Sequence, residues 1–455
     1  MRTRKKCKMT KLYFKNILYP NLKYPWTRQN ITNKKTIGVF DNKIQRSKQQ
    51  HLIVHSIDPK GSKDVDDAFS LEETEEGLFL HVHICDPSAY IEDIKSPSLQ
   101  CAAKNGSSFY PSGHKTKRMF DDLIRKQCSL SRGKCHVTTV SFLFNDDESK
   151  ILQIRINPAT IYCDPKNSHS YENAAMKYRN RDPYVRKIHR LSLVLQQELS
   201  SSELSLLPEP VVFGEMTYLH HSIPKVQSSS HCRVILVPDS SEKIEVKRMV
   251  ALMATAVNGV LANLIALNGT GLESYLDRKV GLYTHFTSPL RRFRDCMLHI
   301  ELKQLLLHLN KPTGLILPND FDKLQSHPIQ HSVFGTQLSE MLETCLAAEK
   351  KQQQLHSQSM QFRFLQYMYQ RVNMDGARRV RIKSRVTRRT PSYIYLNIYI
   401  IDGHSVRMKH IVPRQKKEDT EDNTPGAEHE FNITVCNLPR NKFNDGTLPQ
   451  IEVKF

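Results

Sequence analysis

Residues 57–86 read IDPKGSKDVDDAFSLEETEEGLFLHVHICD, and this stretch decides the fold that we predict for the chain. Apolar residues flank an acidic run that is bounded by Gly61 and Gly77. This pattern predicts a short strand, a loop and a second strand. Four carboxylates lie close together in the run, although the whole chain has a formal net charge of +20: they are Asp58, Asp64, Asp66 and Asp67.

The concentration of one charge sign indicates a bound cation. Converging carboxylates repel one another and shift their pKa values unless a divalent cation lies between them, and Mg²⁺ prefers such oxygen ligands. The alternatives are a solvated acidic turn and a Ca²⁺ loop, although the spacing does not match an EF-hand. In an extended segment, we expect Asp64 and Asp66 to project to one face and Asp67 to the other.

The composition favours a polyanionic partner. The 455 residues suffice for two or three domains, and 66 Lys plus Arg face 46 Asp plus Glu. This balance indicates nucleic acid or an acidic membrane surface. We expect no apolar run of membrane-spanning length, which favours nucleic acid. The ten cysteines contain no CxxC pair, which argues against a zinc knuckle or a disulfide framework and indicates a reducing compartment.

Residues 1–50 form a basic arm, and the first forty of them contain neither Asp nor Glu. Such an arm is typical of a mitochondrial presequence, a nuclear signal, a nucleic-acid contact or a solvated lead-in. We favour an RNA contact or linker, because aromatic residues interleave with the charges and serines are lacking.

Periodicity predicts a mixture of strands and helices. We expect strands at 78–84, 137–144 and 151–161, a loop or hairpin at 208–240, and helices within 165–207, 242–267 and 333–369.

A second motif, YTHFTSPLRRFRDCMLH, occupies residues 283–299. Thr287 or Ser288 can cap a helix whose first turn contains Pro289, where a missing N–H does no harm. The unpaired N–H groups and the helix dipole, beside Arg291, then predict a phosphate site.

The charged residues of this motif also have a second interpretation, because residues four apart on a helix form ion pairs. Arg291 and Asp295 have this spacing, as do Asp295 and His299. We favour ion pairing along the helix for Arg292, Arg294 and Asp295, and we favour it less for Arg291.

The first stretch closely resembles the first signature of the RNB catalytic domain, which defines the ribonuclease II family of exoribonucleases. The second motif resembles the family's Y-T-H-F-T-S-P-I-R-R-Y-x-D-x-x-x-H almost letter for letter, and the order of the two signatures is the expected one. Cys128, Ser129 and Leu130 match a further C-S-L element. The chain is therefore identified as a member of this family.

The resemblance implies an α+β fold in which a mixed sheet packs with helices around an RNA channel, followed by a partial S1/OB-like β module. It implies a hydrolytic 3′-to-5′ exoribonuclease that degrades single-stranded RNA to nucleoside 5′-monophosphates with Mg²⁺, or with Mn²⁺ as the alternative metal. No nucleotide cofactor and no membrane is expected. The protein is expected to act as a monomer or within a larger RNA-decay assembly, in the cytoplasm, with nucleus and mitochondrion as alternatives.

The resemblance also implies roles for individual residues. Asp58, Asp64 and Asp67 match the likelier metal ligands, and Asp66, a fourth candidate ligand, matches the position most sensitive to substitution. Tyr110 matches a tyrosine that packs at the RNA 3′ end, although an aromatic filling the core beneath a turn is an equal alternative. The expected catalytic residues are Asp66, Arg291 and Tyr110, and the expected RNA contacts are Tyr110, Ser288, Arg291, Arg292, Arg378, Arg379 and Arg381.

Two departures from the family favour a competing hypothesis. Leu252 occupies the position of a family Glu that is thought to read the terminal ribose, and Glu245 is a poor substitute for it. Only residues 263–282 separate the apolar helix from the second motif, which is shorter than in the family. The alternatives are an RNA-binding or protein-interaction module with weakened catalysis, and a fragment of a larger helicase-nuclease.

The predicted domain organisation has four parts. Residues 1–50 are the basic arm or the remnant of an upstream barrel, and residues 51–372 are the RNB catalytic domain. Residues 373–415 are the S1/OB-like segment, in which alternation and β-branched residues predict strands and clustered basic residues predict RNA contact. Residues 416–455 are a charged tail, for which we expect disorder and one final strand.

Overall fold

The computed structural model describes most of the chain. The described residues are 38, 41–91, 93, 95–110, 116–201, 215–219, 233–237, 240–268, 275–276, 283–327, 340–354, 380–389, 393–401, 404–413 and 428–433.

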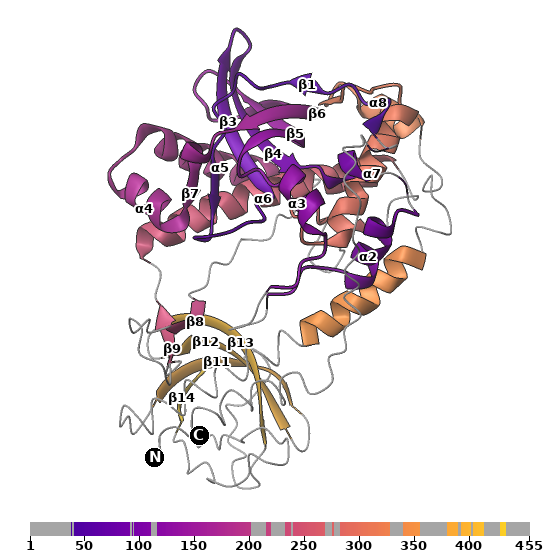
Figure 1. Cartoon of the computed structure of the whole chain (residues 1–455). Coiled ribbons are helices and arrows are strands. Elements are labelled where there is room, and N and C mark those ends of the chain that lie inside the picture. The colour runs from indigo at the N-terminus through magenta and orange to yellow at the C-terminus, as the bar shows by residue number, and fades with distance from the viewer. Residues whose placement is uncertain are drawn as a thin grey trace, which may run out of the picture.

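Figure 1 shows the strands and helices of these residues. The strands are β1 (Ser47–Lys48), β2 (Ser56–Asp58), β3 (Asp67–Thr74), β4 (Gly77–Cys85), β5 (Gly133–Phe144), β6 (Ile151–Cys163), β7 (Ser168–Ser170), β8 (Glu215–Leu219), β9 (Arg233–Val237), β10 (Leu315–Leu317), β11 (Val380–Arg389), β12 (Tyr393–Ile401), β13 (His404–Pro413) and β14 (Glu428–Ile433). The helices are α2 (Pro97–Asn105), α3 (Asp122–Cys128), α4 (Tyr171–Arg179), α5 (Pro183–Ser201), α6 (Ser241–Asn268), α7 (Phe293–His308) and α8 (Phe321–Ser326), with 3₁₀ turns at Pro87–Tyr90 and Pro165–Asn167 and a further helix at 340–354.

The main sheet has the strand order β1-β6-β5-β4-β3, and β10 also pairs with β6. Strands β3 to β6 are antiparallel neighbours, whereas the short β1 runs parallel to β6. Strand β4 lies between β3 and β5 and is buried along almost its whole length, which explains its nearly continuous apolar sequence.

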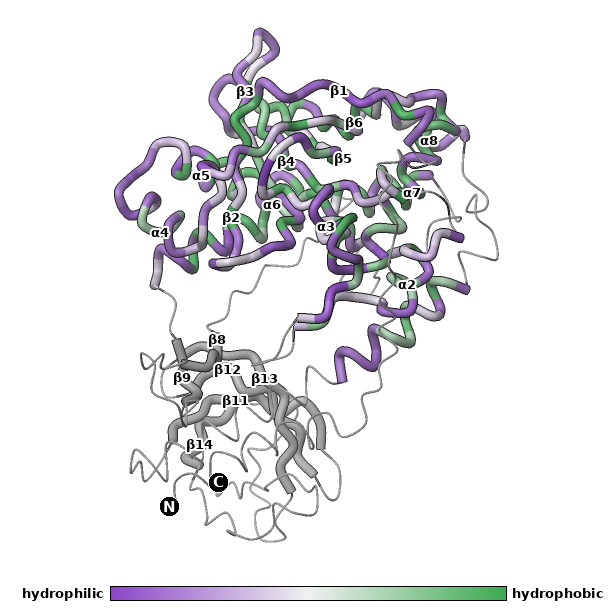
Figure 2. Tube along the Cα trace, in the orientation of Figure 1, coloured by the Kyte–Doolittle hydropathy of each residue, from purple (hydrophilic) through white to green (hydrophobic). Residues whose placement is uncertain are grey.

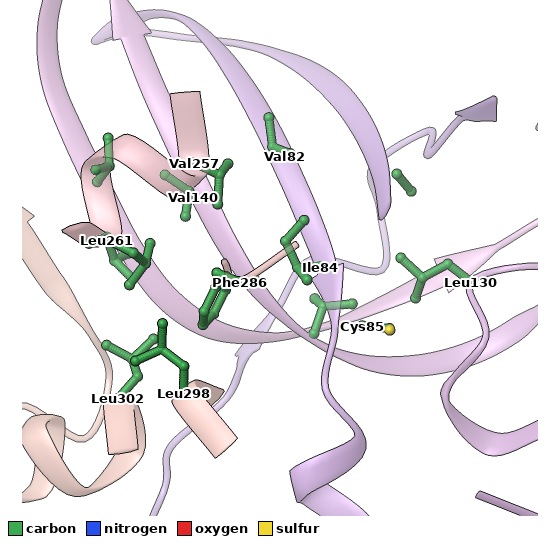
Figure 3. Packing of buried hydrophobic residues seen from close by; sticks show 14 of the residues in the cluster. Val82, Ile84, Cys85, Leu130, Val140, Val257, Leu261, Phe286, Leu298 and Leu302 are labelled. Atoms are coloured by element: carbon green, nitrogen blue, oxygen red, sulfur yellow. The ribbon is translucent and has the colours of Figure 1, made fainter. Parts of the chain in front are cut away.

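The hydrophobic core lies between this sheet and helices α6 and α7. Val82 and Ile84 on β4 lie near Val257 on α6 and Leu298 on α7, with the Phe286 ring between them (Figure 3). Apolar residues are concentrated in these inner elements, and hydrophilic residues in the outer ones, such as α4 (Figure 2). The predicted mixed α+β class is thus confirmed.

Helix α6 corrects the expectation that no apolar run reaches membrane-spanning length. By length and composition this helix could cross a membrane. Two-thirds of its apolar window, 67%, is buried inside the protein, as in the core helix of a soluble domain. Its hydrophobicity is therefore explained by contact with α4, α5 and the sheet.

The predicted strands and helices of the first 268 residues are present, with longer bounds for the strands. The segment 165–207 contains two helices, α4 and α5, and residues 208–240 include the antiparallel hairpin β8–β9. Of the long helix expected at 333–369, the described part is 340–354.

The C-terminal strands form a sheet of their own, with the order β13-β12-β11-β14. All neighbours are antiparallel, and β14 supplies the final strand expected in the tail. The assignment of this sheet to an S1-type barrel stays a prediction, as do the four domain boundaries. Most of residues 1–50, residues 416–427 and residues 434–455 lie outside the described part of the chain.

Candidate active site

Asp66 and Arg291 meet at the centre of the candidate site. Arg291 Nε donates a 3.0 Å hydrogen bond to Asp66 Oδ2, and the Leu290 backbone N–H donates a 2.8 Å bond to Asp66 Oδ1. Asp66 is only 2% exposed. Burial raises the pKa of its carboxyl, and the Arg291 charge opposes this rise. The two predicted catalytic residues, one from each signature, are therefore in direct contact.

The side chain of Arg291 also faces solvent, with 45% of its surface exposed. Among the described residues, Asp66 is its one hydrogen-bond partner, through Nε. The two terminal amino groups are thus available to an anion that reaches the site. The neighbouring carboxylates keep the pKa of Arg291 above its usual value, so the group remains charged.

Asp58 and Asp67 lie beside Asp66, and the three carboxyl groups repel one another when charged. Burial, followed by repulsion from Asp67 and Asp66, raises the pKa of Asp58 to about 8. Burial and repulsion from Asp66 raise the pKa of Asp67 to about 6. The Asp58 Oδ2 atom is buried without a hydrogen-bond partner among the described residues. Buried carboxylates of this kind require a cation or a proton.

These carboxylates do not form a ready-made metal cage. Within the described ranges, no group of three or more His, Cys, Asp or Glu side chains is arranged to hold a metal ion. The orphaned Asp58 oxygen and the mutual repulsion of Asp58, Asp66 and Asp67 nevertheless fit the requirement for a divalent cation.

Asp64 has a different environment from the other three carboxylates. Arg118 Nε contacts both of its carboxylate oxygens at 3.1 Å, and Arg125 Nε lies 3.6 Å from Oδ1. The expectation that Asp64 and Asp66 share one face of a strand was wrong, because strand β3 begins only at Asp67. The alternation of side chains in an extended strand does not apply to the loop before it.

Tyr110 lies next to these charges at the end of a loop that follows α2. Burial of its hydroxyl, with Asp64 nearby, raises the pKa of Tyr110 to about 12, and Ser108 is its hydrogen-bond partner. The residue as a whole is 48% exposed. The ring is therefore not a core-filling aromatic, and it can contact a ligand.

The start of helix α7 differs from the expectation. The helix begins at Phe293 with Arg292 at the N-cap, so Thr287 and Ser288 do not cap it and Pro289 precedes it. Residues 288–292 form a turn in which the Arg291 and Arg292 N–H groups donate to the Ser288 carbonyl oxygen.

The N–H groups at this turn already have acceptors. Leu290 donates to Asp66, and Phe293 donates to the Gly106 carbonyl oxygen. The anion that this turn binds within the protein is therefore the Asp66 carboxylate. The predicted helix start at Thr287 or Ser288 was wrong, and phosphate binding beside Arg291 stays a prediction.

The charged groups around Ser288 form one network. Arg292 Nη2 donates to Ser288 Oγ at 2.8 Å, and Arg292 Nε lies 3.4 Å from Asp295 Oδ2. The Ser288 backbone N–H donates to Asp295 Oδ2 at 2.9 Å. The ion pairing favoured for Arg292 and Asp295 is thus present, while Arg291 pairs with Asp66 and not with Asp295. His299 contacts Thr138, not Asp295, through its Nδ1.

Two residues that the sequence analysis left without a role hold the site together. Asn258 on α6 accepts a bond from the Phe286 N–H at 2.9 Å and donates to the Tyr283 hydroxyl at 2.7 Å, which anchors the second motif. Ser129 accepts from the Val65 N–H and donates to the Lys63 carbonyl oxygen, which fixes the acidic loop. The sequence feature from which this role of Asn258 could have been predicted is its position as a polar residue within an apolar helix.

Leu252 is 3% exposed on α6. Glu245, the poor substitute, contacts His189 Nε2 at 3.1 Å on the neighbouring helix α5. Of the basic residues expected to contact RNA in the C-terminal part, Arg378 and Arg379 lie outside the described residues. Arg381 is in β11, and its side chain is not described.

The RNB domain model matches residues 46–272 of the chain. The chain belongs to the RNB-domain family. The RNB match contains the acidic loop, Tyr110 and helix α6, and the contact between Asp66 and Arg291 extends the site beyond it.

Curated relatives of this RNB protein include ribonucleases R and II. Ribonuclease R of Mycoplasma pneumoniae is 28% identical over 138 residues, which cover 30% of this chain and 19% of the relative. Exoribonuclease 2 of Vibrio parahaemolyticus is 33% identical over 133 residues, which cover 26% of this chain and 20% of the relative. Ribonuclease R of Aquifex aeolicus is 23% identical over 335 residues, which cover 58% of this chain and 47% of the relative. The matches thus span less than half the length of these relatives.

Solved structures show the same fold. Mycoplasma genitalium RNase R in complex with ribose-methylated single-stranded RNA has a TM-score of 0.59 at 17% identity, covering 90% of this RNB protein and 72% of that chain. Yeast Ssd1, described as a pseudonuclease, has a TM-score of 0.54 at 15% identity, and the match covers 86% of this RNB protein and 53% of that chain. The fold therefore occurs both in an RNA-bound nuclease and in a pseudonuclease.

Proposed function

We propose that this protein is a divalent-metal-dependent exoribonuclease that hydrolyses single-stranded RNA from its 3′ end and releases nucleoside 5′-monophosphates. The observation that carries the proposal is the Arg291–Asp66 contact beside the unbalanced carboxylates of Asp58 and Asp67. Family membership supports hydrolysis of RNA. The direction of degradation, the product and the preference for Mg²⁺ over Mn²⁺ rest on the resemblance.

The roles of the site residues follow from their charges: the carboxylates would bind the cation, and Arg291 would bind the phosphate. Asp58, Asp66 and Asp67 would hold the cation, and Asp64 would reach it after leaving Arg118. A bound Mg²⁺ supplies a water of lowered pKa and neutralises charge that develops on the phosphate. The partly exposed guanidinium of Arg291 would meet the same phosphate charge from the protein side, because a planar guanidinium can donate two parallel hydrogen bonds to a phosphate.

Tyr110 would orient the terminal nucleotide. Its half-exposed ring offers a face on which a base or sugar can stack, and its hydroxyl lies close to Asp64 and Arg291. Holding the scissile phosphate between Arg291 and the carboxylates would lower the activation free energy by a large part, because the reacting groups are already oriented. Ser288 would act indirectly, because its hydroxyl is bonded to Arg292.

The experiment that tests the proposal uses purified protein and 3′-hydroxyl single-stranded RNA labelled at its 5′ end. We expect progressive shortening from the 3′ end with Mg²⁺ and none with EDTA. RNA with a 3′-phosphate should be a poorer substrate. Intact RNA at saturating Mg²⁺ would contradict the proposal.

The second candidate is an RNA-binding module that does not cut. It is favoured by Leu252 at the position of the family Glu, and by the absence, within the described ranges, of a preformed group of metal ligands. In the experiment above, this candidate predicts RNA that stays intact but is retarded on a native gel.

We further propose that the protein works in the cytoplasm, as a monomer or within an RNA-decay assembly. Within the described ranges, the seven cysteines are all free thiols, in agreement with a reducing compartment. Fractionation of cells that express a tagged chain tests the compartment.

A further inference from the structure

The loop that carries Tyr110 is held by a buried glutamine on the helix of residues 340–354. Gln352 is 6% exposed, and its Nε2 donates to the Asn105 carbonyl oxygen at 2.5 Å and to the Ser107 carbonyl oxygen at 3.0 Å. Its Oε1 accepts a bond from the Ser107 hydroxyl. Both donors and the acceptor of this amide are therefore used on one short loop.

The same loop is bonded to the turn that carries Arg291. The Ser108 N–H donates to the Arg291 carbonyl oxygen at 2.8 Å, and the Phe293 N–H donates to the Gly106 carbonyl oxygen at 2.8 Å. Tyr110 follows two residues further along the chain. The backbone segment that Gln352 binds thus also contacts the Arg291 backbone, and Tyr110 comes shortly after it in the chain.

The helix of residues 340–354 fits this loop closely. Met341 and Cys345 are buried on the face that also contains Gln352. A Cβ atom at Gly106 would lie 3.0 Å from Ala348 Cβ and 3.1 Å from the Cys345 carbonyl oxygen. Gln352 is therefore a buried polar residue beside the apolar residues Met341 and Cys345, and a leucine would suffice if its role were only packing.

We propose that Gln352 is a positioning residue for the reaction: it fixes the 105–110 loop so that Tyr110 and Arg291 face the terminal nucleotide together. This inference rests on the proposed nuclease function, and it deepens it by adding a residue from a segment outside both signatures. The residue acts through two carbonyl groups of the loop and the Ser107 hydroxyl, and it does not touch the reacting atoms.

The test compares Gln352→Leu with Gln353→Leu, which makes the same change at an exposed position of the same helix. We expect Gln352→Leu to lower kcat on 3′-hydroxyl single-stranded RNA by about tenfold, because a misplacement of about 1 Å costs up to about 10²-fold. Gln353→Leu should retain wild-type kcat. Unchanged kcat in Gln352→Leu, with or without a lowered Tm, overturns the inference.

A double-mutant cycle separates positioning from a general loss of stability. If Gln352 acts through the Tyr110 loop, the kcat of Gln352→Leu with Tyr110→Ala should be close to that of Tyr110→Ala alone, because coupled residues are not additive. Losses that multiply contradict the inference. If Gln352→Leu does not fold, Gln352→Glu serves in its place, because it keeps the acceptor for Ser107 and lacks both donors.

The same double-mutant cycle can be measured as RNA affinity in place of kcat. This second measurement distinguishes failure of this inference from failure of the proposed function. If the wild-type protein leaves RNA intact, the same four proteins are compared by fluorescence anisotropy on labelled single-stranded RNA. Coupled losses of affinity then support positioning without hydrolysis. Independent losses, or none for Gln352→Leu, overturn the positioning role.

Discussion

The Arg291 guanidinium and the Asp66 carboxylate are 225 residues apart in the chain, yet they are joined by a 3.0 Å hydrogen bond from Nε to Oδ2. This contact brings the two signature motifs into one site. It also leaves the partly exposed Arg291 side chain next to the buried carboxylate of Asp66 and the half-buried carboxylates of Asp58 and Asp67. The predictions below follow from this arrangement.

Arg291→Lys should lower kcat by about 10²-fold or more. A lysine keeps the charge but loses the planar fork that can bond Asp66 and a phosphate at once. Steady-state hydrolysis of single-stranded RNA measures the effect. Arg179→Lys is the control, because Arg179 is 69% exposed on α4 and pairs with Glu242. Equal activity in the two variants would show that Arg291 has no catalytic part.

Asp58 should make the metal-free protein sensitive to alkaline pH. Because the pKa of Asp58 is raised to about 8 in the folded state, its stabilising contribution is complete below the pKa of the unfolded chain and is lost as pH rises through 8. In EDTA, the Tm of wild type relative to Asp58→Asn should therefore fall between pH 5 and pH 9, by a few degrees.

Mg²⁺ should reverse this effect. Saturating Mg²⁺ should raise the Tm of wild type at pH 8 more than that of Asp58→Asn, because the cation relieves a repulsion that the variant lacks. Thermal unfolding followed by circular dichroism measures both values. An equal Mg²⁺ shift in the two proteins argues against a cation at Asp58.

Gly106→Ala should destabilise the protein more than Gly133→Ala. Both glycines have positive φ, +68° and +79°, so both substitutions introduce backbone strain. At Gly106 the new methyl group would also meet Ala348, Cys345 and Glu349, whereas nothing lies within 4 Å at Gly133. Denaturant unfolding should show an additional cost of about 1–3 kcal/mol at Gly106. A smaller cost at Gly106 than at Gly133 would contradict the close fit of the 340–354 helix.

Leu252→Glu should lower the Tm by several degrees and should not raise nuclease activity. The position is 3% exposed, and burial of a carboxyl group without a partner is costly. Leu252→Met is the matched control, because it preserves volume and polarity. A gain in kcat or in preference for RNA over DNA would instead show that the side chain faces the terminal sugar.

The sequence was sufficient for the α+β class and for strands β4, β5 and β6 of the main sheet, because these runs are rich in apolar and β-branched residues, with turn residues at their ends. It was also sufficient to nominate Asp66 and Arg291, which occur in ordered motifs. Whether the four carboxylates share one site could not be read from spacing, since Asp64 and Asp66 lie in a loop whose side-chain directions depend on Arg118 and Arg291.

The start of α7 could not be predicted for a similar reason. Ser288 and Pro289 are typical of a helix start, but tertiary contacts of Leu290 with Asp66 and of Phe293 with Gly106 hold this segment as a turn. The role of Gln352 could not be predicted from its neighbours in the sequence, because the segment is rich in Gln, Glu and Lys. Its contacts are with a loop about 245 residues earlier in the chain.

The most direct test of the central claim is the release of nucleoside 5′-monophosphates from 3′-hydroxyl single-stranded RNA by wild type and Asp66→Asn. The asparagine can still accept the Leu290 N–H but lacks the charge that pairs with Arg291 and holds a cation. We predict Mg²⁺-dependent release by wild type, and loss of release with retained RNA binding in Asp66→Asn. Equal release by the two proteins, or none by wild type, would contradict the account.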